Sequence, residues 1–70
     1  MCQAARQLIQ AALDDVPAGP RRVLLLRDVE GLASGEVCEL LGINEASQRV
    51  LLHRGRTHIR RALARDAGRF

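Results

Sequence analysis

The side chains best suited to binding chemistry gather in the last third of this 70-residue chain, where arginines recur beside two histidines. Residues 46–70 hold seven Arg against the single Asp66, a net charge of +6, whereas residues 1–45 hold four Arg against seven Asp and Glu, a net charge of −3. Guanidinium groups donate paired hydrogen bonds to phosphate and to guanine. This asymmetry is expected of a chain that lays one segment on a polyanion, with an ordinary solvated helix face as the alternative.

Other kinds of chemistry have little support. Cys2, Cys38, His53 and His58 fit no zinc-ligand spacing, and the chain has no Ser-His-Asp set, phosphate loop or enclosed carboxylate pair. Seventy residues are also too few to enclose a deep pocket. We therefore expect a protein that is not an enzyme and that binds no cofactor or metal. Without a leader or an apolar run of about 18 residues, a cytoplasmic location is expected.

The composition predicts an all-α fold. The chain is 47% apolar with Phe70 as its single aromatic residue, so the core must be aliphatic, which suits packed helices in one domain spanning residues 1–70. Apolar residues at helical spacing predict a first helix over 3–15, ending before a proline. Pro20 then opens a second helix over 21–29, because its missing N–H costs nothing in a first turn.

The third and fourth helices are expected at about Ser34–Leu41 and Glu45–Arg65. Gly42 can take the left-handed conformation that closes a helix, Ile43 would bury into the turn, and Asn44 is a good N-cap. Two helices joined by so short a turn, the second of them basic, are typical of a helix-turn-helix over about residues 34–65. An ordinary helical hairpin is the alternative.

A helical wheel divides the fourth helix into a narrow apolar edge and a wide basic surface. The predicted core stripe comprises Gln48, Leu52, Gly55, Ile59 and Leu63. One flank carries Arg49, His53, Arg56 and Arg60, and the side opposite the core carries Val50, Arg54, Thr57 and Arg61. Such a surface suits insertion into the phosphate-walled major groove of DNA.

Three segments carry a resemblance that extends over essentially the whole chain. They are PRRVLLLRDVEGL from Pro20, EVCELLGIN from Glu36 and LHRGR from Leu52. At matching spacing they resemble region 4 of the extracytoplasmic-function (ECF) sigma factors of bacterial RNA polymerase, within the sigma-70 family. The resemblance implies a four-helix, sigma region 4 type fold without a sheet, related to winged-helix domains. It also implies binding to the −35 promoter element and contact with the β-subunit flap of RNA polymerase. Because no domain for the −10 element is evident, we expect a piece of a longer sigma factor.

The chain departs from the family pattern at several positions. Ala33 replaces a capping Ser, so Ser34 is expected to take over the N-cap of the third helix. Gln48 replaces a usually buried Val and is expected to be partly exposed or bonded to backbone. Val50 and Leu51 replace the usual Ser-Arg, which removes a cation and predicts altered promoter specificity. Gly55 replaces Ala, which weakens the helix by about 1 kcal/mol while permitting close packing.

The candidate DNA contacts fall into two groups. The base-edge candidates on the first turns of the recognition helix are Ser47, Arg49, Val50, His53 and Arg54. The phosphate candidates are Arg56, Arg60, Arg27 and, at the start of the third helix, Ser34 and Gly35. The alternatives are that Arg60 and Arg61 are only solvated and that Arg27 pairs with Asp28 or Glu30.

Two further functional hypotheses stay open at this point. The chain could be an interaction module that is sequestered by an anti-sigma factor, with the apolar Val50 and Leu51 at the contact. It could instead be the effector domain of a response regulator, although the Thr-Val-Lys-x-His sequence and the further dimerising helix usual there are not evident.

Overall fold

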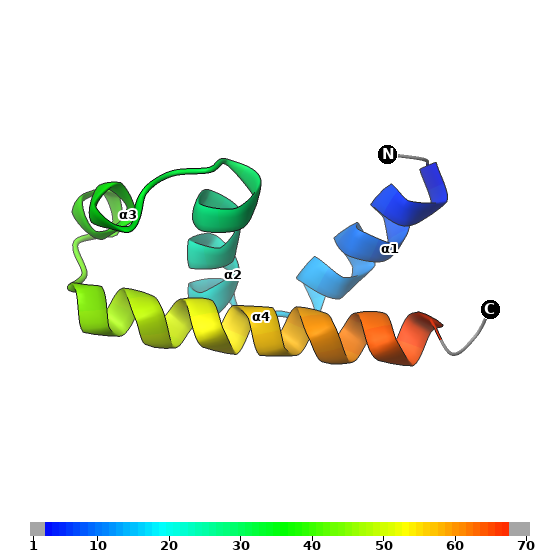
Figure 1. The fold of residues 1–70 in the computed structure, drawn as a ribbon. Coiled ribbons are helices and arrows are strands. Elements are labelled where there is room, and N and C mark those ends of the chain that lie inside the picture. Colours follow the sequence, from blue (N-terminus) through cyan, green and yellow to red (C-terminus); the bar gives the residue numbers. More distant parts are fainter. Residues whose placement is uncertain (1–2, 68–70) are drawn as a thin grey trace.

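Four α-helices make up the computed structural model, which describes residues 3–67 and contains no strand in that range (Figure 1). Cys2 and Phe70 lie outside the described residues. The all-α prediction is therefore confirmed. The helices are α1 (Gln3–Asp14), α2 (Ala18–Leu24), α3 (Ser34–Leu41) and α4 (Glu45–Ala67), and α2 continues into a π-helical segment, η1 (Leu25–Val29).

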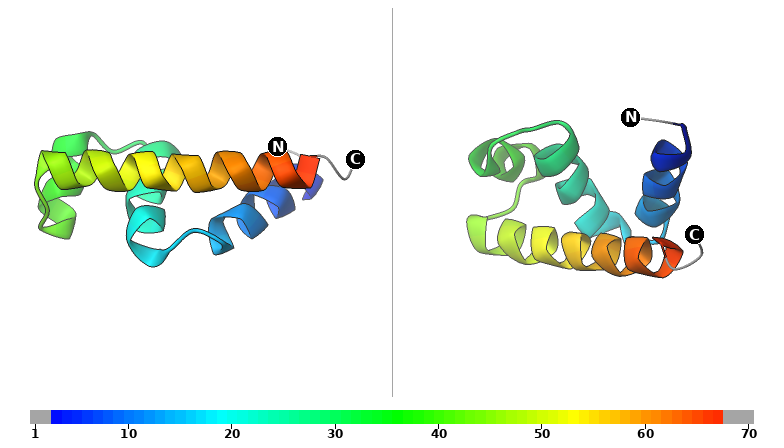
Figure 2. Two further views of the ribbon diagram at one scale, coloured as in Figure 1. Left: turned by 90° about the horizontal axis from the view of Figure 1, so that it is seen from below. Right: turned by 45° about the vertical axis from the view of Figure 1, so that its right-hand side comes forward.

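Helix α4 is the base of the fold, and the other three helices lie over one side of it (Figures 1 and 2). Its 23 residues correspond to roughly 34 Å at 1.5 Å per residue. The described chain measures 40 × 20 × 15 Å, so the length of α4 sets its long axis. Helices α1, α2 and α3 each contact α4. The side of α4 turned away from them is left uncovered.

The core is small and aliphatic, as the composition predicts. Its fully buried cluster joins all four helices through Leu13, Val23, Leu24, Val37 and Leu52. Partly buried side chains extend it, among them Ile9, Leu26, Leu41, Ile43 and Ile59. Burying each such aliphatic side chain contributes about 1.5–3 kcal/mol. Because the core holds so few of them, the polar contacts between helices matter to the stability of this fold.

The second helix, with η1 included, begins three residues before the predicted start at Arg21 and ends at the predicted Val29. It begins at Ala18, after Pro17, and Pro20 lies buried within its first turn, where the Arg21 N–H already donates to the Pro17 carbonyl at 2.9 Å. Its last part widens into η1, where the Glu30 N–H donates to the Leu25 carbonyl five residues back. The five residues of η1 form about one turn. Such a segment is too short for hydrophobic spacing to distinguish a π-helix from an α-helix.

The junction between α3 and α4 follows the prediction closely. Gly42 has φ +66° and ψ +39°, the left-handed conformation that ends α3, and the Ile43 N–H donates to the Cys38 carbonyl at 3.0 Å. Asn44 caps α4, because its Oδ1 accepts the Ser47 N–H at 2.8 Å. The turn residues thus fix the angle at which α4 leaves α3.

The predicted N-cap of α3 is wrong. Ala33 holds the cap position with extended backbone, and no side chain of its own can accept a hydrogen bond there. The Glu36 carboxylate instead accepts the Ala33 N–H at 3.1 Å. Ser34 is the first helical residue, and its hydroxyl donates to the Glu45 carboxylate at 3.2 Å. Ser34 thereby links the two helices of the helix-turn-helix rather than capping one.

None of the helices within the described range is both long and apolar enough to cross a membrane.

Candidate nucleic-acid interface

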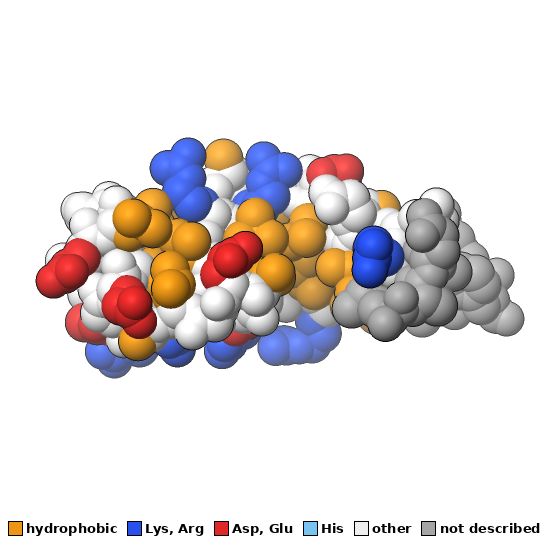
Figure 3. Space-filling model, turned by 90° about the horizontal axis from the view of Figure 1, so that it is seen from above, with side chains coloured by type: hydrophobic (Ala, Val, Ile, Leu, Met, Phe, Trp, Pro, Cys, Tyr) orange, Lys and Arg blue, Asp and Glu red, His pale blue; other side chains and the backbone are white. Residues whose placement is uncertain are grey.

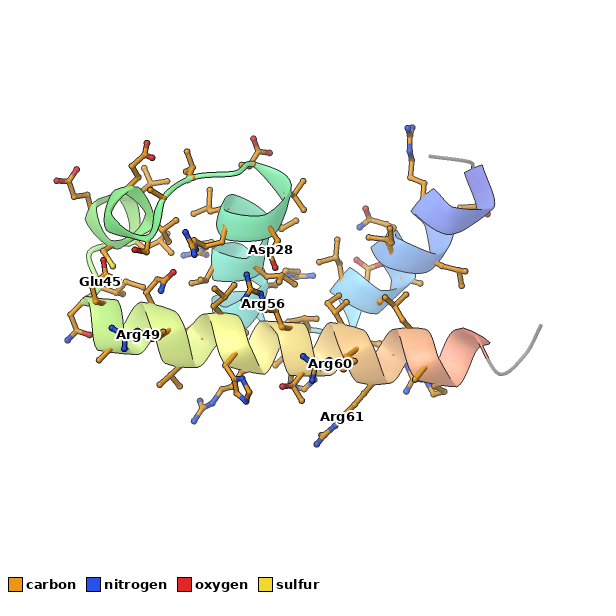
Figure 4. The ribbon with its side chains drawn as sticks, in the orientation of Figure 1. Asp28, Glu45, Arg49, Arg56, Arg60 and Arg61 are labelled. Atoms are coloured by element: carbon orange, nitrogen blue, oxygen red, sulfur yellow. The ribbon has the colours of Figure 1, made fainter. Side chains whose placement is uncertain are left out.

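The exposed side of α4 carries most of the basic residues predicted to bind DNA. One edge of the helix is buried against the other three through Gln48, Leu52, Gly55 and Ala62, with Ile59 partly buried. Arg49, His53, Arg54, Arg60 and Arg61 are exposed. Figure 4 shows Arg61 pointing away from the packed helices. The predicted division of α4 into a narrow buried edge and a wide basic surface is confirmed.

Four arginines of this surface have no ion-pair or hydrogen-bond partner among the described residues. They are Arg49, Arg54, Arg60 and Arg61. The sequence between residues 46 and 61 also contains no carboxylate that could neutralise them. Their positive charges therefore add along α4 and are available to an anionic partner.

Arg56 is held differently from these four. Its Nε donates to Asp28 Oδ2 at 2.9 Å and its Nη2 to Asp28 Oδ1 at 2.7 Å, so the pair is bidentate and joins η1 to α4 (Figure 4). The hydrogen bond from Arg56 lowers the pKa of Asp28, against the opposing effect of partial burial. The same bond raises the pKa of Arg56. A phosphate would compete with Asp28 for this guanidinium, and the predicted phosphate contact of Arg56 stays a prediction.

Arg27 lies partly buried at the end of the second helix. Its Nη1 donates to the Leu32 carbonyl at 3.2 Å, and its Nε is buried without a hydrogen-bond partner among the described residues. Arg27 thus braces the loop that leads into α3. Within the described residues Arg27 pairs with neither Asp28 nor Glu30, and Asp28 pairs with Arg56 instead. A phosphate contact by Arg27 stays a prediction.

The start of α3 already has carboxylates beside it. Glu36 accepts the Ala33 N–H and Glu45 accepts the Ser34 hydroxyl, so an incoming phosphate meets two negative charges there. Partial burial raises the pKa of the neighbouring Cys38 thiol, and the Glu45 carboxylate raises it further. Gly35 is exposed with open space around it. The phosphate contacts of Ser34 and Gly35 stay predictions, with these carboxylates as competitors.

Two hollows lie on the exposed surface of α4, and both include residues that the sequence prediction left out. The one over the first turns has a volume of about 460 Å³ and is lined by Ile43, Ala46, Ser47, Val50 and Leu51. The other, of about 320 Å³, is lined by His53, Arg54, Thr57, His58 and Arg61. Thr57 and Arg61 follow Val50 by seven and eleven residues. The helical wheel already placed Thr57 and Arg61 on the face of Val50, opposite the core, but they were not selected as candidate DNA contacts.

Gln48 departs from expectation. Its side chain is 2% exposed, and its Oε1 is buried without a hydrogen-bond partner in the described part of the chain. Neither the predicted partial exposure nor the predicted bond to backbone is found among the described residues, whereas the placement of Gln48 in the core stripe of α4 is confirmed. Burying an amide oxygen without a partner destabilises a fold by about 1–3 kcal/mol.

Residues 6–59 match the family model described as "Sigma-70, region 4". The chain belongs to this family. The matched range includes α2, α3, the turn between α3 and α4, and the first fifteen residues of α4. Region 4 is part of transcription initiation factors, a family that is not enzymatic. The match assigns the chain to sigma-70 region 4 rather than to the response-regulator effector domains.

A curated relative of this region 4 is the "ECF RNA polymerase sigma factor SigE" of Mycolicibacterium smegmatis. The two are 40% identical over 59 residues, which cover 84% of this chain and 23% of the relative. The resemblance to ECF sigma factors is thus confirmed, and the chain spans about a quarter of the length of that relative. No solved structure matches the chain at a significant level.

Proposed function

We propose that this chain is the region 4 domain of an ECF sigma factor and that it binds the −35 promoter element through the exposed side of α4. The observation that carries the proposal is the set of four exposed arginines on α4 without partners among the described residues. Their unneutralised charges match a phosphate backbone, and the family membership supplies the helix-turn-helix context.

In this proposal the two ends of α4 have different roles. The first turns of a recognition helix reach base edges, which assigns base contacts to Ser47, Arg49, Val50, His53 and Arg54. Arg60 lies about two turns further along, where it would meet a phosphate, together with Arg56 once Asp28 releases it. Phosphate contacts set the position on the duplex, whereas base contacts set the sequence that is preferred.

The experiment compares binding of a promoter duplex by the chain and by Arg54→Ala. Loss of a paired base contact is expected to weaken binding by about 1–3 kcal/mol, or roughly 5- to 150-fold. Arg6→Ala is the matched control, because Arg6 is also exposed but lies on α1, among the helices that cover the other side of α4. Equal affinities for the chain and Arg54→Ala would contradict the assignment of α4.

We further propose that the face formed by the end of η1, the loop after it and α3 contacts the β-flap of RNA polymerase. Val29 and Leu40 are 63% and 65% exposed, and a hollow of about 420 Å³ beside Leu40 is lined also by Leu32, Glu36 and Glu39. Figure 3 shows apolar side chains flanked by acidic ones on this side of the molecule. An exposed apolar patch with a polar rim is typical of a protein-binding surface.

This second proposal has its own test. Leu40→Asp is expected to abolish recruitment of polymerase core to promoter DNA while leaving binding of the isolated chain to DNA unchanged. An anti-sigma factor is the alternative partner for the same face. An anti-sigma factor would be recognised as a protein that binds the wild-type chain but not Leu40→Asp and that competes with polymerase for the wild-type chain. Unchanged recruitment of polymerase by Leu40→Asp would contradict the β-flap assignment.

A further inference from the structure

The hollow at the start of α4 is apolar, although the surface around it is basic. Among its lining side chains, Ile43, Ala46, Val50 and Leu51 are apolar and only Ser47 is polar. Val50 is the large apolar side chain among them that is exposed, with 49% of its surface accessible. Leu51, by contrast, is partly buried against the core, so its side chain forms a fixed wall of the hollow.

The same face of α4 becomes cationic as it continues from Val50. Arg54, Thr57 and Arg61 follow Val50 by four, seven and eleven residues, which places all of them within about 40° of it around the helix. No carboxylate occurs between residues 46 and 61. A partner that covers this face must therefore present an apolar group at the start of the helix and negative charge further along.

The DNA major groove has this combination. Its walls are phosphates, and the one apolar group on its base edges is the 5-methyl group of thymine. Thymine also presents its O4 acceptor beside that methyl group, and the Ser47 hydroxyl, one turn before Val50, can donate to it. A cytosine at the same place would present an amine and no methyl group.

We infer that Val50, with Ala46 and Leu51 beside it, forms a contact site for the methyl group of one thymine in the bound DNA. The inference rests on the proposed DNA-binding function and deepens it, because it names a base that this chain selects. Burial of one methyl group against Val50 corresponds to a roughly three- to tenfold gain in affinity. Arginine at this end of the helix would instead favour guanine.

The test uses the 70-residue chain and a duplex selected by that chain from a randomised DNA pool. Each thymine of the selected site is replaced in turn by uracil, which removes only the methyl group. At one position the replacement is expected to weaken binding about three- to tenfold. In Val50→Ser, which removes both methyl groups of the side chain, the same replacement should change affinity less than about twofold.

Ala11→Ser is the matched control, because Ala11 is another exposed apolar residue and lies on α1 rather than on α4. This control should keep the full preference for thymine over uracil. If the chain binds its selected duplex but no uracil replacement weakens binding, or if Val50→Ser discriminates as well as the wild type, the methyl contact is overturned and the proposed function stands. If the chain selects no duplex at all, both fail.

Discussion

Arg56 on α4 and Asp28 on η1 form a bidentate ion pair, with nitrogen–oxygen distances of 2.7 and 2.9 Å, across 28 residues of sequence. This pair connects the second helix to the recognition helix and withholds one arginine from the otherwise unpaired basic surface. Family membership alone does not predict this ion pair, because helical spacing and motifs do not indicate which charged side chains on different helices meet. It gives Asp28 two testable effects, one on DNA binding and one on stability.

Asp28→Asn is expected to increase the affinity for DNA. The substitution removes a negative charge and releases the Arg56 guanidinium, so one more phosphate can be neutralised and the slope of log Kobs against log salt should steepen by about 0.9. Titration of a promoter duplex at several salt concentrations measures this slope. Adding Arg56→Met to Asp28→Asn should remove the steepening. A slope that is the same in the wild type and Asp28→Asn would show that Arg56 stays away from phosphates.

The ion pair should also make folding sensitive to acid. Arg56 holds the pKa of Asp28 below its ordinary value of 3.8, so the pair stabilises the fold fully above that pH and loses its contribution as pH falls through the lowered pKa. Because both side chains are partly exposed, the contribution is about 0.5–1 kcal/mol. Urea unfolding should show that the wild type exceeds Asp28→Asn by this amount at pH 6, with the difference vanishing toward pH 2. A constant difference would exclude the linkage.

Gly55 is expected to resist replacement by alanine. A Cβ at this position would lie 3.0 Å from the Pro20 carbonyl oxygen and 3.3 Å from Leu24 Cβ, so α2 would have to move. Gly55→Ala should therefore fail to give the gain of up to about 1 kcal/mol that alanine brings inside a helix, and should lower the free energy of unfolding. Gly35→Ala is the control, because nothing lies within 4 Å of a Cβ there, and it should stabilise by about 0.5 kcal/mol. Equal gains at both positions would refute the tight packing.

Gln48 offers a stabilising substitution. Methionine has a similar shape and no amide oxygen to leave buried without a partner, so Gln48→Met is expected to raise the free energy of unfolding by about 1 kcal/mol. Denaturant unfolding of the two proteins measures the change. If Gln48→Met is less stable than the wild type, the amide has a partner that the structure does not contain.

The helix-turn-helix could be predicted from sequence because its signals are local. Gly42 ends α3 and Asn44 caps α4, each through a contact with residues three to five positions away. The core edge of α4 follows from helical spacing in the same way. The start of α2 was misplaced for a local reason too, because Pro17 and Pro20 are both compatible with a first turn.

The features that were missed depend on contacts between distant residues. The pairing of Arg56 with Asp28 could not be derived from either residue alone, and it changes which arginines are available to DNA. The hollow around Val50 could not be predicted from the helix face alone, because Ile43 in the turn also lines it. The burial of Gln48 was visible on the helical wheel, but its polar side chain suggested exposure. The position of Gln48 on the core edge of α4, and not the polarity of its side chain, therefore determines its burial.

The salt dependence of DNA binding tests the central claim most directly. If Arg60 neutralises one phosphate of the bound duplex, log Kobs should fall with log salt, and Arg60→Ala should reduce the magnitude of this slope by about 0.9. Arg6→Ala on α1 should leave the slope unchanged. A promoter duplex bound with a slope near zero, or with a slope that Arg60→Ala does not alter and Arg6→Ala does, would contradict the assignment of α4 as the DNA-binding surface.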